Sequence, residues 1–192
     1  AHTSCPSEVA ALTYNKRDCL AVAAATGIPT ANRYTLNQGE TISLDAIEEK
    51  VGFPCFVKAN RAGSSFGVYK VYDKNELQPA IEKAFKEDHQ LLIETALQGK
   101  EITVGVLEWE NEVKVLPITE IISENDFFDY QAKYEGKSTE ITPAQLPTEW
   151  EASAKKMAKQ LYSQMGLKGI SRSEVLFQDG VPHLLEINTI PV

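Results

Sequence analysis

The stretch GISRSEVLFQDGVPHLLEIN, residues 169–188, decides the fold class of this chain. Two runs rich in apolar residues, Ile170–Phe177 and His183–Asn188, lie on either side of the turn-forming sequence Gln178-Asp179-Gly180. Strand-like runs that flank a short glycine-containing turn are typical of an antiparallel β-hairpin. The sequence therefore predicts two paired antiparallel strands in this stretch.

Charged or amide side chains stand two positions apart on each predicted strand. Because successive side chains of a strand point to opposite faces, Arg172 and Glu174 share one face of the first strand. Glu186 and Asn188 share one face of the second strand in the same way. If the turn has an odd number of loop residues, such as three with Gly180 in the left-handed conformation, these two faces coincide. The pattern then brings two carboxylates, a carboxamide and a guanidinium together.

This constellation indicates a site for a hard cation. Two carboxylates that converge without a partner repel each other, and an oxygen-ligated Mg²⁺ held against phosphates relieves the repulsion. The alternative is a solvated strand face with one Arg–Glu pair. Glu186 favours the cation site, because it lies in the apolar run Leu184-Leu185-Glu186-Ile187, where a carboxylate is normally paired or metal-bound. Glu174, Glu186 and Asn188 are the predicted metal ligands.

Helices and hairpins alternate along the rest of the chain. Helices are predicted near Lys16–Thr26, over Ser43–Val51, from Asp73 to about Lys86 and from Thr148 to Met165. Strands are predicted over Phe53–Lys58, Val68–Tyr72 and Gln90–Glu94, and a hairpin is predicted from Ile102–Leu107 and Val113–Ile122 across Glu110-Asn111-Glu112. This order predicts an α+β class with largely antiparallel sheets, in two lobes over residues 1–92 and 93–192.

Capping chemistry marks the helix starts. Asn15 is a suitable N-cap for the first predicted helix. Asp73 with Glu76, and Thr148 with Glu151, have the spacing of a capping box. We therefore expect side-chain caps at all three positions.

A glycine-rich loop between two predicted strands is a candidate phosphate site. Arg61-Ala62-Gly63-Ser64-Ser65-Phe66-Gly67 has small residues that let backbone N–H groups approach an anion, and two hydroxyls that add donors. Lys58 ends the preceding strand, where its ammonium group could meet the same anion. The loop is not a P-loop, because the GxxxxGK[ST] order is absent. Taken alone, the loop is better explained as an ordinary hairpin turn.

Two further segments are weaker candidates. Leu91–Leu97, followed by Gly99-Lys100-Glu101, could offer a strand edge to an adenine, although in isolation a plain strand and turn is the favoured interpretation. The aromatic stretch from Asp126 to Tyr134 lies in the irregular segment 125–147 and has the character of a lid in which Lys133 reaches a phosphoryl group. An Ω-loop packed by its own side chains is the alternative, and both interpretations can hold.

Composition excludes several classes of protein. The 192 residues are 43% hydrophobic and carry a net charge of −8, which disfavours nucleic acid as a partner. Three cysteines without CxxC spacing indicate buried thiols in a reducing compartment, and Cys55 sits in an apolar run. There is no run of transmembrane length and no signal-peptide pattern, so a cytoplasmic location is expected and a membrane is not.

Taken in order, these segments resemble the D-alanine–D-alanine ligase family of the ATP-grasp superfamily. The resemblance is carried by Val57-Lys58 with Arg61–Gly67, by Leu92-Ile93-Glu94 through Gly99-Lys100-Glu101, by Phe128-Asp129-Tyr130-Gln131-Ala132-Lys133-Tyr134, by Pro143-Ala144, and by Gly169–Glu174 with Leu185-Glu186-Ile187-Asn188-Thr189. It covers nearly the whole chain and implies the ATP-grasp fold, in which two α+β lobes sandwich ATP.

The resemblance also implies residue roles. The nucleotide would be contacted by Lys16, Lys58, Ser65, Glu94, Thr95, Ala96, Leu97, Glu101, Phe127 and Lys133. Arg172, Ser64, Lys133 and Tyr134 would serve catalysis and substrate order, and Glu174, Glu186 and Asn188 would bind two Mg²⁺ ions, or Mn²⁺ in their place.

The implied reaction joins two D-alanines. One carboxylate attacks the γ-phosphate of ATP, and the amine of a second D-alanine attacks the acyl phosphate, giving D-alanyl-D-alanine for peptidoglycan synthesis. The Asp-Tyr-x-Ala-Lys-Tyr pattern at residues 129–134 is similar to dipeptide-forming rather than depsipeptide-forming relatives. The family implies a homodimer when full length.

The sequence departs from the family at three positions. Glu174 stands where the family usually has Asp, Thr95 where many members have Lys, and Val192 where Gly commonly follows. The family's N-terminal domain has no counterpart here, so we expect residues 1–192 alone to make little or no dipeptide. The alternatives are another ATP-grasp carboxylate–amine ligase and a non-catalytic nucleotide-binding module.

Overall fold

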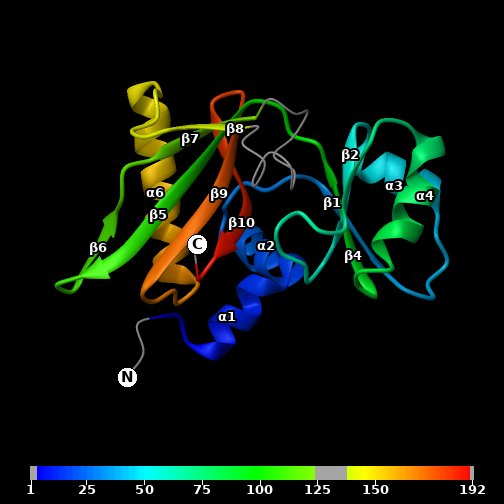
Figure 1. Cartoon of the computed structure of the whole chain (residues 1–192), viewed down its shortest axis with the longest axis horizontal. Helices are drawn as coiled ribbons and strands as arrows, with labels where there is room; N and C mark the ends of the chain where they lie inside the picture. Colours follow the sequence, from blue (N-terminus) through cyan, green and yellow to red (C-terminus); the bar gives the residue numbers. More distant parts are fainter. Residues whose placement is uncertain (1–3, 124–137, 191–192) are drawn as a thin grey trace. The chain divides into compact units, whose positions relative to one another are not determined.

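The computed structural model describes residues 4–123 and 138–190. Within them the chain forms two compact units, a first unit of residues 4–30, 98–123 and 138–190 and a second unit of residues 31–97. Each unit packs helices on an antiparallel sheet, which confirms the predicted α+β class (Figure 1). Residues 92 and 93, where the lobe boundary was predicted, lie inside one strand of the second unit.

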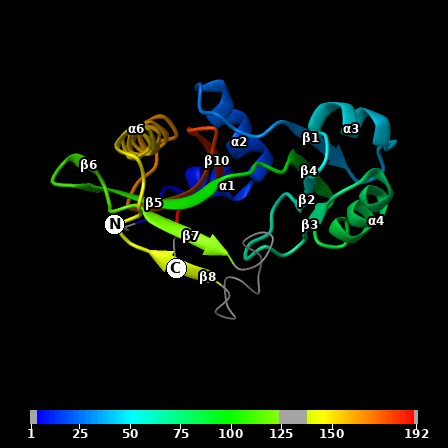
Figure 2. The same ribbon diagram turned by 90° about the horizontal axis from the view of Figure 1, so that it is seen from above.

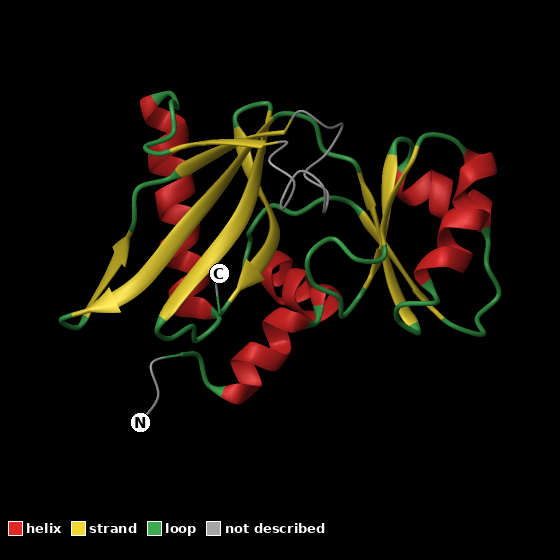
Figure 3. Cartoon of the chain, in the orientation of Figure 1, coloured by secondary structure: helices red, strands yellow, loops and turns green. Residues whose placement is uncertain are grey.

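The first unit is built on a six-stranded sheet (Figure 3). Its strands are β5 (Lys100–Trp109), β6 (Glu112–Val115), β7 (Thr119–Ser123), β8 (Ser138–Ile141), β9 (Ile170–Gln178) and β10 (Val181–Asn188). They run in the order β10-β9-β5-β7-β8, with β6 paired to β5, and every pair is antiparallel. Three helices belong to this unit: α1 (Ser7–Tyr14), α2 (Lys16–Ala25) and α6 (Thr148–Gln164).

Helix α6 covers one face of this sheet. Trp150 stacks on Phe177 with ring centroids 4.7 Å apart, and the buried side of the helix is apolar. Because strand side chains alternate, the neighbours Glu174 and Leu176 of β9 point to the opposite face. We call that opposite face, on which Arg172 also lies, the polar face.

The second unit is a four-stranded antiparallel sheet in the order β1-β4-β2-β3. Its elements are β1 (Arg33–Asn37), α3 (Leu44–Val51), β2 (Cys55–Ala59), β3 (Val68–Val71), α4 (Lys74–Ala84) and β4 (Gln90–Thr95). Both helices lie on the same side of the sheet (Figure 2) and enclose the core with Val57 and Ile93. Lys58 and Glu94 alternate with these core residues, so they lie on the face opposite α3 and α4, which we call the far face.

Two of the three predicted helix caps are confirmed. Asn15 accepts a hydrogen bond from the backbone N–H of Asp18, and Asp73 accepts one from Asn75. The cap predicted at Thr148 is wrong, because Pro147 holds the N-cap position without a side-chain bond and Thr148 is already helical.

No helix in the described part of the chain is long and apolar enough to cross a membrane.

The predicted hairpin after β5 differs in detail. Its turn has two residues, Glu110 and Asn111, which both have positive φ. The long second strand is divided into β6 and β7 on either side of Leu116-Pro117, as expected for a proline that cannot donate to a ladder. Helix α1 and strands β1 and β8 were not predicted.

Candidate active site

The β9–β10 hairpin aligns the predicted metal ligands by a different device from the one expected. Its turn has two residues, Asp179 and Gly180, rather than three. Regular pairing beyond such a turn would put Leu185 opposite Glu174. The register instead shifts at Leu185, and Glu186 comes opposite Glu174. A β-bulge, and not an odd-numbered loop, therefore makes the two faces coincide.

Five predicted residues meet on the polar face of the first unit. Glu174 Oε1 accepts hydrogen bonds from Arg172 Nη2 at 3.1 Å and from Asn188 Nδ2 at 3.3 Å. Asn188 Nδ2 also lies 3.4 Å from Glu186 Oε1, and Lys16 Nζ at the start of α2 lies 4.0 Å from Glu186 Oε2. Glu174 is only 8% exposed, so these cationic and amide donors compensate a carboxylate that has lost most of its water.

The oxygen donors of this cluster suit a hard divalent cation. Glu174 and Glu186 supply carboxylates and Asn188 supplies a carboxamide oxygen once its amide group turns. In residues 4–123 and 138–190 no group of three or more His, Cys, Asp or Glu side chains could hold a metal. The set therefore consists of two carboxylates and one amide, which fits Mg²⁺ bound through few protein oxygens together with phosphates.

Glu101 extends the polar face along β5. The pairing of β5 with β9 places Thr103 opposite Glu174 and Glu101 opposite Leu176. Directly opposed residues of an antiparallel pair share a face, so Glu101 lies on the same face as the metal-ligand candidates. It is the sixth predicted residue that the first unit gathers there.

A largely buried ion pair lies on the far face of the second unit. Lys58 Nζ of β2 is 2.7 Å from Glu94 Oε2 of β4, and the two side chains are 16% and 5% exposed. Arg33 of β1 is directly opposite Glu94. Arg33 is a candidate that the sequence analysis missed, because β1 was not predicted.

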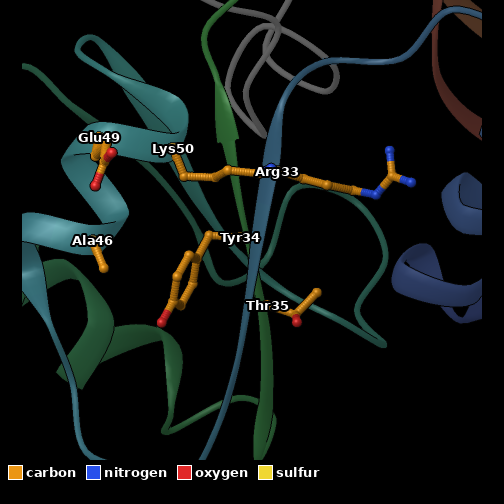
Figure 4. Close-up of a pocket in the computed structure, with 6 residues that line it drawn as sticks. All are labelled: Arg33, Tyr34, Thr35, Ala46, Glu49 and Lys50. Atoms are coloured by element: carbon orange, nitrogen blue, oxygen red, sulfur yellow. The ribbon is translucent and has the colours of Figure 1, made fainter.

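The surroundings of Arg33 show how β1 separates two environments. A cavity of about 540 Å³ is lined by Arg33, Tyr34, Thr35, Ala46, Glu49 and Lys50. Within it Tyr34 points to the side of α3, whereas Arg33 and Thr35 point away from that helix (Figure 4). No predicted site residue of the described part of the chain lines this cavity.

The glycine-rich loop contains a tight turn with left-handed backbone conformations. Ser64 and Ser65 have φ values of 51° and 59°, and Gly67 has a φ of 65°. A Cβ atom at Gly67 would lie 2.8 Å from the Cβ of Ala59, so this position requires glycine for space as well as for conformation. Ser64 and Ser65 are the two central residues of a turn that is closed by a hydrogen bond from Phe66 N to Gly63 O at 3.0 Å.

Asp88 fixes the root of this loop, and sequence analysis missed it. Its carboxylate accepts hydrogen bonds from Arg61 N at 2.8 Å, Arg61 Nε at 3.1 Å, Arg61 Nη2 at 2.9 Å and Gln90 N at 3.1 Å. Burial opposes ionisation of Asp88, but the Arg61 side chain and the two backbone donors outweigh it and hold the pKa of Asp88 below its usual value. Arg61, the first residue of the loop, is therefore held by a bidentate ion pair with Asp88.

The segment predicted to line an adenine offers less than expected. Thr95 N donates to Asn32 O and Ala96 N donates to Pro54 O, both at 3.0 Å. Thr95 Oγ1 donates to Val51 O at 2.7 Å. These two N–H groups already donate within the second unit, which corrects the expectation of an open strand edge at Thr95 and Ala96.

Leu97 ends this unit as a half-buried side chain. Phe127, Lys133 and Tyr134, the predicted lid residues, lie outside the described residues.

The chain is similar to known proteins in both sequence and structure. Residues 22–192 match the protein family described as "D-ala D-ala ligase C-terminus". A D-alanine–D-alanine ligase of Flavobacterium johnsoniae is 53% identical over 98% of this chain, and one of Phocaeicola vulgatus is 42% identical over 99%. The chain spans 58% and 59% of the length of these two relatives.

Solved structures agree with the sequence relatives. The VanG D-Ala:D-Ser ligase of Enterococcus faecalis superposes with a TM-score of 0.86 at 32% identity, covering 98% of this chain and 56% of that one. A D-alanine–D-alanine ligase of Bacillus anthracis complexed with ATP superposes with a TM-score of 0.82 at 28% identity, covering 98% of this chain and 59% of that one.

Proposed function

This chain belongs to the D-alanine–D-alanine ligase family, whose C-terminal region it matches, and we propose that the full-length protein joins two D-alanine molecules with conversion of ATP to ADP and phosphate. The product would be D-alanyl-D-alanine, a precursor for peptidoglycan. The observation that carries the proposal is the convergence of Arg172, Glu174, Glu186 and Asn188 on one face of the β9–β10 hairpin. The identity to relatives over nearly the whole chain supports the choice of D-alanine.

In the first unit the proposed roles concern phosphate and cation. Glu174, Glu186 and Asn188 would hold Mg²⁺, which supplies positive charge that neutralises the phosphates when it is bound. Lys16 lies 4.0 Å from Glu186, close enough to place a second positive charge beside the same phosphates. Glu101, on the same face, would accept from a ribose hydroxyl.

In the second unit the proposed roles concern the nucleotide. The backbone turn at Ser64 and Ser65 would donate N–H groups to phosphate oxygens, and the Lys58 ammonium would contact them too. Glu94 orients the Lys58 ammonium on the far face through their 2.7 Å contact. Ser64 would also help to order the bound amino acid.

The chemistry would proceed in two displacements. A carboxylate oxygen of the first D-alanine attacks the γ-phosphorus of ATP and the bond from that phosphorus to the bridging oxygen breaks. ADP departs, and the D-alanine is left as its acyl phosphate. The amine of the second D-alanine then attacks the acyl carbon, loses a proton, and expels phosphate. Arg172 would donate to the oxygens on which negative charge develops in both steps, because its guanidinium is held on the polar face by Glu174.

The residues outside the described part of the chain complete the proposal. Lys133 would contact the γ-phosphate, Tyr134 would help to hold the substrate side, and Phe127 would pack near the base. With these residues the protein contributes mainly alignment of reactants and exclusion of water.

A substrate panel tests the proposed function. ADP release by the full-length protein with ATP and Mg²⁺ is measured with D-alanine alone, with L-alanine alone, and with D-alanine plus D-serine or D-lactate, and the products are identified by mass spectrometry. We expect ADP release that requires D-alanine and yields D-alanyl-D-alanine as the main product. Release that needs a different carboxylate or amine would replace the substrate, and ATP binding without release for any pair would indicate a nucleotide-binding module.

A further inference from the structure

Thr103 presents a buried hydroxyl on the polar face without using it. Among the described residues its Oγ1 atom has no hydrogen-bond partner, although the atom is shielded from solvent. A buried polar group in this state lowers stability, because it has lost its water and gained nothing in return. Such groups in native proteins call for an explanation, and a role in binding is one of the few available.

The position of Thr103 in the sheet suggests that role. Glu174 in β9 has two cross-strand neighbours: Glu186 of β10 on one side and Thr103 of β5 on the other. Directly opposed residues in antiparallel strands have Cβ atoms about 5 Å apart and share a face. The unused hydroxyl is thus the next polar side chain to Glu174 on the side away from Glu186.

The hydrogen bonds that Glu174 makes in the described structure would compete with a bound cation. Its Oε1 atom accepts from Arg172 Nη2 and from Asn188 Nδ2. Both donors have roles of their own in the proposed function, so binding of a cation and phosphates redirects them. A metal-ligating carboxylate is normally oriented by a further hydrogen bond from outside the ligand set.

We propose that Thr103 is a positioning residue for the cation site, whose hydroxyl donates to the Glu174 carboxylate when a divalent cation and nucleotide are bound. The inference rests on the proposed function, because it takes Glu174 as a metal ligand. It adds a residue that the sequence analysis did not select and that acts through Glu174 rather than by contact with the substrate.

The role has a consequence that a purely structural threonine would not have. Replacing Thr103 by Val removes the unsatisfied hydroxyl and keeps the branched shape, so the ligand-free protein becomes more stable. The same change removes the donor to Glu174, so the cation binds less tightly. Stability and affinity move in opposite directions.

The test compares three variants of the full-length protein. Thr103→Val removes the hydroxyl, and Thr103→Ser keeps it. Thr119→Val is the matched control, because Thr119 faces Thr103 across β5 and β7 but its hydroxyl already bonds to that of Thr142 at 2.6 Å. Two quantities are measured: the affinity for Mn²⁺ in the presence of a non-hydrolysable ATP analogue, by electron paramagnetic resonance, and the Tm of the ligand-free protein.

We expect Thr103→Val to weaken Mn²⁺ binding about tenfold and to raise the ligand-free Tm by about 2 to 4 °C, with Thr103→Ser close to wild type in affinity. Thr119→Val should leave the affinity unchanged. Wild-type affinity in Thr103→Val would overturn the inference while leaving the proposed function intact. Absence of Mn²⁺ binding in the wild-type protein would overturn the metal site of the proposed function, and this inference with it.

Discussion

Replacement of Asp88 by Asn should loosen the root of the glycine-rich loop without changing its sequence. The carboxylate accepts three hydrogen bonds from Arg61 and one from Gln90 N, and its side chain is 5% exposed. Hydrogen bonds to a charged partner contribute about 1.5 to 3 kcal/mol each, but Arg61 is half-exposed and regains water when the charge is lost. Since Asn retains one carbonyl acceptor, we expect a loss of about 2 kcal/mol in the free energy of unfolding.

Two measurements report the effect of Asp88→Asn on stability. Urea unfolding is monitored by far-UV circular dichroism, because Trp109 and Trp150 both lie in the first unit and Asp88 lies in the second. Hydrogen exchange at the Arg61 and Gln90 amides reports the loop root directly, and a loss of about 2 kcal/mol corresponds to roughly 30-fold faster exchange where local opening dominates. Glu151→Gln, which breaks an exposed pair with Lys155 within α6, is the control and should cost less than about 0.5 kcal/mol.

The pH dependence of the stability difference tests the same role of Asp88 independently. The pKa of Asp88 is lowered in the folded protein, so its ionised form stabilises the fold at pH values above its unfolded pKa. The stability advantage of wild type over Asp88→Asn should be constant between pH 7 and about pH 5 and should shrink as the pH falls below about 4. An advantage below about 0.5 kcal/mol at pH 7, or one that grows on acidification, would refute the assigned role of Asp88.

Two further outcomes are expected. Lys58→Met leaves Glu94 buried without its ammonium partner and should lower the free energy of unfolding, measured in urea, by about 3 kcal/mol. The double variant Lys58→Met with Glu94→Leu should recover most of that loss, and equal losses in the single and double variants would contradict a coupled pair. Burial, together with the Glu186 charge, raises the pKa of Cys19 to about 12, and burial raises that of Cys55 to about 11, so a thiol reagent at pH 8 should label these two only after urea is added; rapid labelling of both in the folded protein would contradict their burial.

Local signals in the sequence were enough for most elements and for the set of charged and amide side chains that converge on the polar face. The cap at Asn15, the glycine-rich loop and the β9–β10 hairpin each depend on neighbouring residues, so they could be predicted from short segments. The position of Glu186 within an apolar run pointed to a partnered carboxylate, and the structure places Asn188 and Lys16 near it.

Features that depend on distant parts of the chain could not be predicted in this way. The bulge at Leu185 has no signature in the alternation of side chains, so the correct alignment of Glu186 with Glu174 was reached through the wrong turn length. The ion pair between Arg61 and Asp88 joins residues 27 positions apart, and nothing local marks either as the partner of the other. Strand β1 is a polar edge strand that gains its order from pairing with β4.

The assignment of the cation and phosphate site is tested most directly by D-alanine-dependent ADP release in Glu186→Gln. The change keeps the size of the side chain and removes a charged ligand, and the matched control is Glu108→Gln, whose carboxylate pairs with Lys168 on the surface. We predict that Glu186→Gln lowers kcat by at least about a hundredfold while Glu108→Gln stays close to wild type. Wild-type turnover in Glu186→Gln would contradict the assignment of the polar face as the catalytic site.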